Sequence, residues 1–334
     1  MPARIHKIFS VYGIVLFAIV FCFSLSSQAF VNEDKVSTSK GLAHYSMGQV
    51  YDLLGETESS ILEYKQAMEF DESNYLIHLR LGTNYARLGM MNEAINQLET
   101  AQQLNSDDLQ SHYLLAIIHS SRRDYDKAAG EYEFILKKFA KAEPDNVEVY
   151  NYLGQLYYSQ RKYDQAIAQF EKILSLEPKN ADIMFSLGSL YAELKQKDKA
   201  VEVLKKSLSI DPDHDGSLNT LGYLYAENDE HLDEAIDMIN HALKLNPDNG
   251  AYLDSLGWAY FKKGMYEKAM EILKQADDHL KDPVIYDHLG DVSFKINHLD
   301  DAIHYWELSL KLQPEQEEIL HKLTEVKSIQ ASKK

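Results

Sequence analysis

The sequence contains little of several features that would point to other classes of protein. It has one cysteine and seven prolines among 334 residues. A single cysteine excludes an internal disulfide framework and a zinc site built on several thiolates. The sequence also has no glycine-rich phosphate loop, no His-Glu-x-x-His and no Gly-x-Ser-x-Gly nucleophile motif. The chain is therefore predicted not to be an enzyme and to need no cofactor or metal.

Long apolar runs are also rare, and the clear example lies at the N-terminus. Arg4 and Lys7 precede an apolar run from Ile8 to Phe23, and Ser27-Gln28-Ala29 then resembles a signal-peptidase site. Residues 1–29 are therefore predicted to be a signal peptide, which implies export to the periplasm or to a membrane-associated place in the cell envelope. Residues 30–40 are polar and are predicted to be a flexible spacer.

The same apolar segment allows two other interpretations. Residues 8–25 form a stretch of 18 residues, near the lower limit for a membrane span, so an uncleaved anchor would tether the chain to the membrane. Lipid attachment at Cys22 is weaker, because the bulky Phe21 stands where lipoprotein sites carry a small residue. Cleavage would leave the mature chain without cysteine.

Basic residues are scarce relative to acidic ones. The formal net charge is −18, and it becomes −20 if Arg4 and Lys7 leave with the signal peptide. A surface this acidic repels nucleic acid and anionic membranes. Nucleic acid is therefore excluded as the expected partner.

What the sequence does contain is a repeat. Leu-Gly followed three residues later by Tyr recurs along the chain, and the small residue of this motif returns every 33 to 38 positions. A period of this length is typical of a solenoid. The small residues at this position are Gly48, Gly82, Ala116, Gly154, Gly188, Gly222, Gly257 and Gly290.

A second small residue follows each of these by twelve or thirteen positions. Two small side chains at this spacing lie on successive helices and allow their backbones to approach closely. Pro178, Pro212, Pro247 and Pro314 fall just after the second helix, where proline stops a helix from continuing. Each repeat is therefore predicted to be a helical hairpin. The second small residues are Ser60, Ala94, Ala128, Ala166, Ala200, Ala235, Ala269 and Ala302.

On these motifs the chain resembles the tetratricopeptide repeat (TPR) proteins. The repeat starting at Val147 carries the family pattern most fully, with Tyr150, Leu153, Gly154, Tyr157, Ala166, Phe170 and Pro178. The resemblance implies an all-α, right-handed α-solenoid of about eight TPR hairpins over residues 41–314. The repeats begin near Gly41, Tyr75, Leu109, Val147, Ala181, Asp215, Gly250 and Pro283.

Two local features complete the expected architecture. The third repeat has four extra residues between Leu136 and Asn146, which are predicted to lengthen its second helix by about one turn. Residues 315–330 are predicted to form a C-terminal capping helix. In that helix Ile319, Leu320, Leu323, Val326 and Ile329 lie on one side.

The TPR resemblance also implies a concave groove lined by positions 2, 5, 9 and 12 of each first helix. These positions carry no Lys or Arg, which argues against a groove that clamps the carboxylate of a chaperone. They do carry aromatic rings and carboxylates, which suit a peptide with apolar and basic side chains. The candidate groove residues are Tyr113, Asn151, Tyr158, Phe185, Asn219, Tyr223, Asp254, Trp258, Phe261, Asp287, Asp291 and Phe294.

Each groove residue also has a simpler interpretation. Aromatic rings at positions 2 and 5 often pack against the adjacent repeat, and acidic side chains on helices are usually solvated. Asn151 and Asn219 are candidates for holding a peptide backbone, because an amide both donates and accepts hydrogen bonds. His214, between Asp213 and Asp215, is expected to be an ordinary turn residue and not a metal ligand.

These observations lead to two functional hypotheses. The segments Asp254–Trp258 and Asp287–Asp291 are similar to those of exported bacterial TPR proteins, including lipoprotein adaptors for periplasmic proteases. The first hypothesis is a non-catalytic scaffold or adaptor of the bacterial cell envelope that binds a peptide or protein segment. The alternative is a structural, self-associating component of a secretion, pilus or polysaccharide-export assembly, acting through its convex face or stack ends. The sequence leaves the oligomeric state open.

Overall fold

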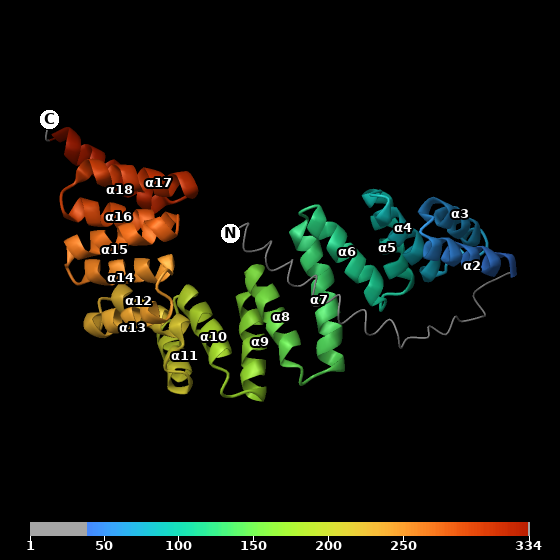
Figure 1. Ribbon diagram of the computed structural model, residues 1–334, viewed down its shortest axis with the longest axis horizontal. Coiled ribbons are helices and arrows are strands. Elements are labelled where there is room, and N and C mark those ends of the chain that lie inside the picture. The colour runs from blue at the N-terminus through green and yellow to red at the C-terminus, as the bar shows by residue number, and fades with distance from the viewer. Residues whose placement is uncertain (1–38, 333–334) are drawn as a thin grey trace. The chain divides into compact units, whose positions relative to one another are not determined.

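The computed structural model describes residues 39–332. Over this range the chain forms seventeen α-helices, α2 to α18, and no β-strand (Figure 1). The predicted signal peptide or anchor, residues 1–29, and residues 30–38 of the predicted spacer lie outside the described residues. No helix among those described combines the length and apolar character that a membrane crossing requires.

The helices follow one another as a repeat solenoid of hairpins. Seven pairs pack directly against each other, and α8 (Val147–Ser159) and α9 (Tyr163–Leu176) stand between the third and fourth of these pairs in the sequence. The pairs are α2 (Ser39–Leu54) with α3 (Thr57–Met68), α4 (Tyr75–Arg87) with α5 (Met91–Leu104), α6 (Leu109–Ser121) with α7 (Tyr125–Ala142), α10 (Ala181–Glu193) with α11 (Lys197–Ile210), α12 (Asp215–Glu227) with α13 (Leu232–Leu245), α14 (Gly250–Lys262) with α15 (Tyr266–His279), and α16 (Pro283–Lys295) with α17 (Leu299–Leu312).

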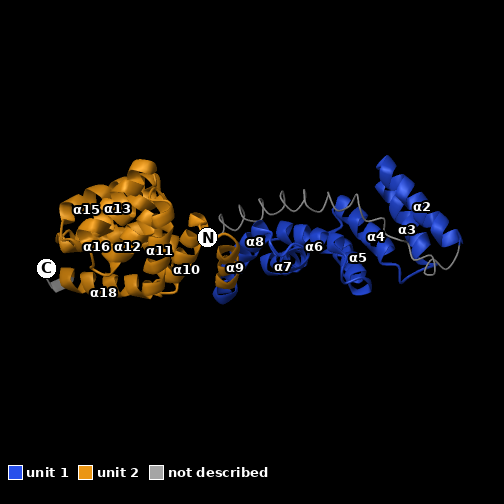
Figure 2. Cartoon of the chain, turned by 90° about the horizontal axis from the view of Figure 1, so that it is seen from below, with its two compact units in different colours: residues 1–166 blue, residues 167–334 orange. Residues whose placement is uncertain are grey.

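The chain divides into two compact units, coloured separately in Figure 2. Unit 1 ends at Ala166 and unit 2 begins at Ile167. Within unit 1, α3 packs on α4, α5 on α6 and α7 on α8, so consecutive hairpins are stacked. Within unit 2 the first helices α10, α12, α14 and α16 are also neighbours of one another. The side chains on their shared face can therefore interact from repeat to repeat.

The small residues of the repeat motif are explained by the distance between paired helices. A Cβ added to Gly82 would lie 2.6 Å from Cγ of Leu98, closer than van der Waals contact allows. A Cβ added to Gly257 would lie 2.5 Å from Cγ of Leu273. Ala94 is fully buried at the matching place on the second helix. The Leu-Gly motif thus lets a leucine of the second helix occupy the space above the glycine.

Two expectations about helix lengths can be compared with the structure. Helix α7 has 18 residues whereas α5 and α11 have 14, which confirms that the extra residues of the third repeat lengthen its second helix. Helix α2 begins at Ser39, slightly before Gly41, so the last residues of the predicted spacer are helical.

The last helix, α18 (Glu317–Ser332), covers the end of unit 2. Ile319, Leu323 and Val326 are buried and form one apolar cluster with Trp306 and Ala302 of α17. Leu320 was expected on the same side, but 49% of its surface is exposed because it lies one position past the buried row. A helix that covers the apolar face of the preceding hairpin acts as a cap.

Candidate protein-binding surface

Most of the predicted groove residues lie on the first helices of unit 2. We call the residues on the shared face of α12, α14 and α16 the unit 2 stripe. They are Asn219, Tyr223, Asp254, Trp258, Phe261, Asp287, Asp291 and Phe294. The structure brings neighbouring members of this set into one connected polar and aromatic network.

Trp258 lies at the centre of that network and is largely buried. Its ring stacks on His288 with centroids 4.1 Å apart and on Phe261 at 4.9 Å. Its Nε1 donates a hydrogen bond of 2.7 Å to Glu227 of α12. Only 9% of Trp258 is exposed, so it supports the stripe from below and offers little surface to a partner.

Asp254 is also buried, and its carboxylate is hydrogen-bonded to a side chain of a neighbouring helix. Nδ1 of His288, on α16, lies 2.8 Å from Oδ1 of Asp254. Burial lowers the pKa of His288, but the carboxylates of Asp254, Asp287 and Asp291 raise it by more, so the pKa stands above its ordinary value. His288 and Asp254 therefore form a buried hydrogen-bonded pair, and this carboxylate is already occupied.

Asp287 and Asp291 hold a lysine from the capping helix. Nζ of Lys322, on α18, lies 2.8 Å from Asp287 and 2.8 Å from Asp291. Burial lowers the pKa of Lys322, and the two carboxylates outweigh this and raise it. Burial and the repulsion of Asp287 raise the pKa of Asp291, with Lys322 acting in the opposite direction. The unit 2 stripe itself carries no Lys or Arg, but Lys322 of α18 contacts its two carboxylates.

The remaining members of the stripe are partly accessible. Tyr223 is half-buried, and burial together with the charges of Glu227, Asp254 and Asp287 raises the pKa of its hydroxyl. The Oδ1 atom of Asn219 is buried without a hydrogen-bond partner in the described part of the chain. Phe294 contacts the Trp306 ring at 5.9 Å.

The other four predicted groove residues lie elsewhere. Phe185 of α10 packs its ring against His214 at 5.0 Å. In unit 1, Tyr113 is 8% exposed, whereas Tyr158 is 44% exposed beside Tyr163. The amide of Asn151 accepts a hydrogen bond of 3.1 Å from Gln155. Of these four, Tyr158 offers the most surface.

Sequence reasoning missed a cavity on the first helices of unit 1. It has a volume of about 300 Å³, and Arg80 of α4 is its cationic member. The Nε atom of Arg80 has no hydrogen-bond partner among residues 39–332, although the guanidinium has a side-chain hydrogen bond with Tyr45. Arg80 is at position 6 of its repeat, next to a stripe position, so counting position 6 would have found it. The cavity is lined by Gly41, Leu42, Tyr45, Ser46, Gln49, Ala67, Asp71, Asn74, Leu76 and Arg80, so it also contains one carboxylate.

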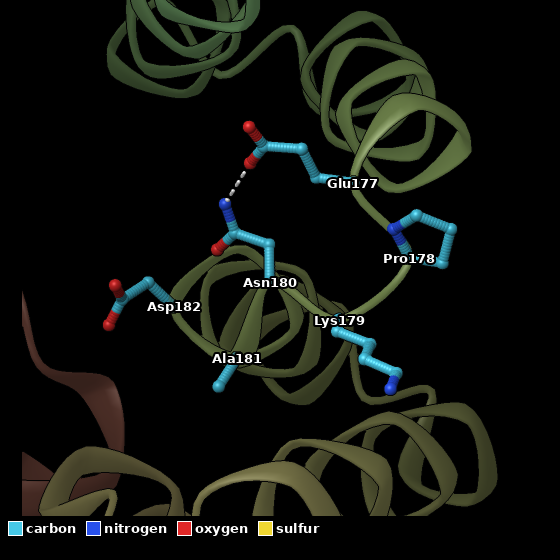
Figure 3. Close-up of a pocket in the computed structure, with 6 residues that line it drawn as sticks. All are labelled: Glu177, Pro178, Lys179, Asn180, Ala181 and Asp182. Carbon is cyan, nitrogen blue, oxygen red and sulfur yellow. Dashed lines mark hydrogen bonds between the residues drawn. The ribbon is translucent and has the colours of Figure 1, made fainter.

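A larger hollow lies at the turn between α9 and α10 (Figure 3). It has a volume of about 660 Å³ and is lined by residues 177–182. Asn180 donates a 2.8 Å hydrogen bond to Glu177 and accepts one of 3.0 Å from the Ile183 N–H, which caps α10. These polar groups are used to build the turn, so this hollow is not the better candidate.

The histidine and aspartate clusters also have structural partners. Nδ1 of His214 accepts a hydrogen bond of 3.1 Å from the Ser217 N–H and so caps α12. Within the described range no three His, Cys, Asp or Glu side chains are grouped closely enough to hold a metal ion.

Comparison with known proteins agrees with this architecture. A tetratricopeptide repeat family model matches residues 79–143, 153–215 and 220–280, which is more than half of the chain. The chain belongs to the tetratricopeptide repeat family. Two further models of the same repeat match residues 135–168 and 42–74.

Individual relatives resemble parts of this TPR chain. It is 35% identical over 105 residues to the BBSome complex member BBS4 of Mus musculus, covering 31% of this chain and 19% of the relative. It is 29% identical over 100 residues to the Hsp70-Hsp90 organising protein of Plasmodium falciparum, covering 29% and 18%. The chain thus spans about a fifth of the length of these curated relatives.

Among solved structures, the APC/C hetero-tetramer Cut9–Hcn1 contains a chain with a similar fold. The TM-score is 0.56 with 18% identity, and the match covers 88% of this chain and 58% of the other. At this identity the similarity concerns the fold alone.

Proposed function

We propose that this TPR chain is a non-catalytic adaptor that binds a protein segment carrying basic and apolar side chains along the unit 2 stripe. Proteins of this family generally mediate protein–protein interactions, and the names of the relatives refer to protein complexes and to a chaperone organiser. The observation that carries the proposal is the position of Lys322. An ammonium group held by Asp287 and Asp291 at 2.8 Å indicates which partner chemistry these carboxylates accept.

The contacts of the unit 2 stripe suggest which of its residues are structural and which could contact a partner. Trp258, Asp254 and His288 are buried and hold the helices in register, while Tyr223, Phe261 and Phe294 remain partly exposed. A lysine or arginine of the partner would take the place of Lys322, and its apolar neighbours would pack on the exposed rings. Lys322 is therefore an internal competitor for the same site.

Peptide binding tests this proposal directly. A fluorescently labelled peptide of alternating Leu and Lys is titrated with the purified chain, and fluorescence anisotropy is measured beside a peptide of alternating Leu and Glu. The Lys peptide should bind preferentially. Lys322→Ala should strengthen its binding several-fold, because the competing ammonium is removed.

The acidic pair has a matched control. Asp287→Asn with Asp291→Asn should reduce binding of the Lys peptide strongly. Glu267→Gln with Glu271→Gln makes the same change in net charge at two exposed positions of α15 and should change binding little. An equal loss in both double variants would mean that the peptide responds only to the overall acidity of the chain, and the proposal would be wrong.

We also propose that the adaptor acts in the bacterial cell envelope after export. Support comes from the N-terminal sequence alone, with basic residues, an apolar run and Ser27-Gln28-Ala29. N-terminal sequencing of the chain recovered from the envelope fraction is the test. A start at Phe30 indicates cleavage, an intact Met1 indicates an anchor, and recovery only from the cytoplasm contradicts export.

A further inference from the structure

The outer face of α2 differs from the same face of the later first helices. Counting from the first residue of each repeat, position 7 is a leucine in all seven later repeats, and it is at most 4% exposed in each. Its counterpart in the first repeat is Met47, which is 45% exposed. The buried leucines are Leu81, Leu115, Leu153, Leu187, Leu221, Leu256 and Leu289.

Position 10 shows the same contrast. It is at most 9% exposed in the later repeats, where it is mostly apolar, but Val50 of α2 is 46% exposed. Met47, Val50 and Leu54 are spaced by three and four residues and so share one face of α2, with Leu53 at its edge. Leu54 is 65% exposed and Leu53 is 88% exposed. We call these four residues the α2 face.

The α2 face is apolar and carries no charge. Helix α2 has no acidic residue in its first turn and no basic residue in its last. Its single carboxylate, Asp52, points to the other side and accepts hydrogen bonds of 2.7 Å from Ser60 and Tyr64. In a chain of net charge −18, an uncharged face is one that can approach a copy of itself without strong repulsion.

The last described helix, α18, presents a different surface, on which Leu320 is exposed among charged residues. Helix α18 buries Ile319, Leu323 and Val326 and turns Glu318, Glu325 and Lys327 outward. A charged outer surface on α18 disfavours joining the α2 face of one copy to the C-terminal end of another. The remaining arrangement pairs the α2 face of one copy with the α2 face of the other. A two-fold symmetry axis brings the same surface of both copies together in this way.

We propose that the α2 face is a docking surface for the α2 face of a second copy, forming a two-fold symmetric dimer. In the later repeats positions 7 and 10 of this face pack in the protein interior, so Met47 and Val50 stand where a neighbouring helix is otherwise accommodated. Burial of Met47, Val50 and the two leucines from both copies supplies the apolar contact. This inference rests on the solenoid fold and is independent of the proposed peptide binding.

The first test is the mass in solution of the chain purified after export. Size-exclusion chromatography with light scattering, over a range of protein concentrations, should give twice the protomer mass for the wild type. Met47→Glu with Val50→Glu should weaken dimerisation roughly tenfold or more, because four carboxylates would then face each other. Both positions are exposed, so thermal unfolding should stay close to that of the wild type.

A matched control uses equally exposed apolar residues of unit 2. Val284 and Leu320 are 47% and 49% exposed, and Val284→Glu with Leu320→Glu should leave the dimer intact. A wild type that is monomeric at every concentration, or a dimer that survives both double variants, would overturn the proposal.

Charge complementation identifies the occupant. A chain with Met47→Lys and Val50→Lys should pair with the Met47→Glu and Val50→Glu chain when the two are mixed, although neither forms a dimer alone. If mixing restores nothing and the wild-type α2 face cross-links to residues 8–23 of its own chain or to another protein, the face has a different occupant and the dimer is rejected.

Discussion

The two units differ in how the charged side chains of their first helices are paired. In unit 2, Asp287 and Asp291 meet Lys322 from the capping helix, and Asp254 meets His288. In unit 1, Arg80 lines a cavity of about 300 Å³, and its Nε has no hydrogen-bond partner among the described residues. The TPR fold sets the position of a charged side chain on its helix. Whether that charge has an oppositely charged partner depends on the residues of the neighbouring helices.

Two carboxylates, the partly buried Asp52 of unit 1 and the buried Asp254 of unit 2, also differ in their partners. Asp52 of unit 1 accepts hydrogen bonds from the hydroxyls of Ser60 and Tyr64 and from the amide of Asn84, each 2.7 Å long. Asp254 of unit 2 is paired with a histidine. Neutral donors keep their protons over the physiological pH range, whereas histidine is the side chain that titrates there. Of these two carboxylates, Asp254 is therefore the one whose pairing we expect to respond to pH.

The largest effect is expected from removing Trp258. Trp258→Ala should destabilise unit 2 by about 3–5 kcal/mol, because it leaves a cavity beneath His288 and Phe261. Tyr158→Ala in unit 1, where the ring is 44% exposed, should cost about 1 kcal/mol or less. Denaturant unfolding followed by circular dichroism measures both. Equal losses would mean that burial does not make Trp258 more important for stability than Tyr158.

The pair of His288 and Asp254 is expected to make the thermal stability of unit 2 depend on pH, with an effect of intermediate size. The raised pKa of His288 adds stability that is fully present below the unfolded pKa of about 6.5 and is lost as pH rises through the folded pKa. The wild type should therefore lose thermal stability between about pH 6.5 and the raised folded pKa. A chain with Asp254→Asn and His288→Gln should lose this dependence.

The measurement is the thermal midpoint across this pH range for both proteins. Single Asp254→Asn and His288→Gln variants show whether the two side chains are coupled. If the wild type and the double variant lose stability in parallel, another group is responsible.

The smallest effect is expected at Arg80. Burial of Arg80 costs desolvation energy and leaves its Nε unpaired, whereas a hydrogen bond with Tyr45 and the charge of Asp52 favour the cation, so Arg80→Met should change the stability of unit 1 by about 1 kcal/mol or less. Lys322→Met should instead destabilise unit 2, because it leaves Asp287 and Asp291 facing each other. Thermal unfolding of the two variants gives the comparison, with the exposed Arg87→Met as a control. A clear loss at Arg80 would show that this arginine is a structural residue.

The regular part of the fold was predictable because it depends on local spacing. The interval between small residues gave the helical hairpins, and the four extra residues gave the longer α7. The candidate site was less predictable. Spacing shows that Asp287 and Asp291 share a face, but it cannot show that Lys322 of α18 reaches them.

The burial of Trp258 could not be predicted either, because it also depends on contacts between different helices. Trp258 occupies a stripe position, yet His288 from the next first helix covers one side of its ring and Glu227 from the previous one binds its Nε1. His288 had no feature in the sequence that separates it from solvated histidines. Such contacts join residues 30 to 34 positions apart and appear only when the helices are placed side by side.

Lys322 has one more consequence, because it touches two parts of unit 2 at once. Its Nζ lies 5.9 Å from the centroid of the Trp306 ring, and Trp306 is one of the two tryptophans in the chain. A partner ammonium that displaces Lys322 would remove a positive charge from beside that indole. The fluorescence emission of Trp306 should therefore shift when a partner's ammonium replaces Lys322 at Asp287 and Asp291. This shift would report binding of the partner without an added label.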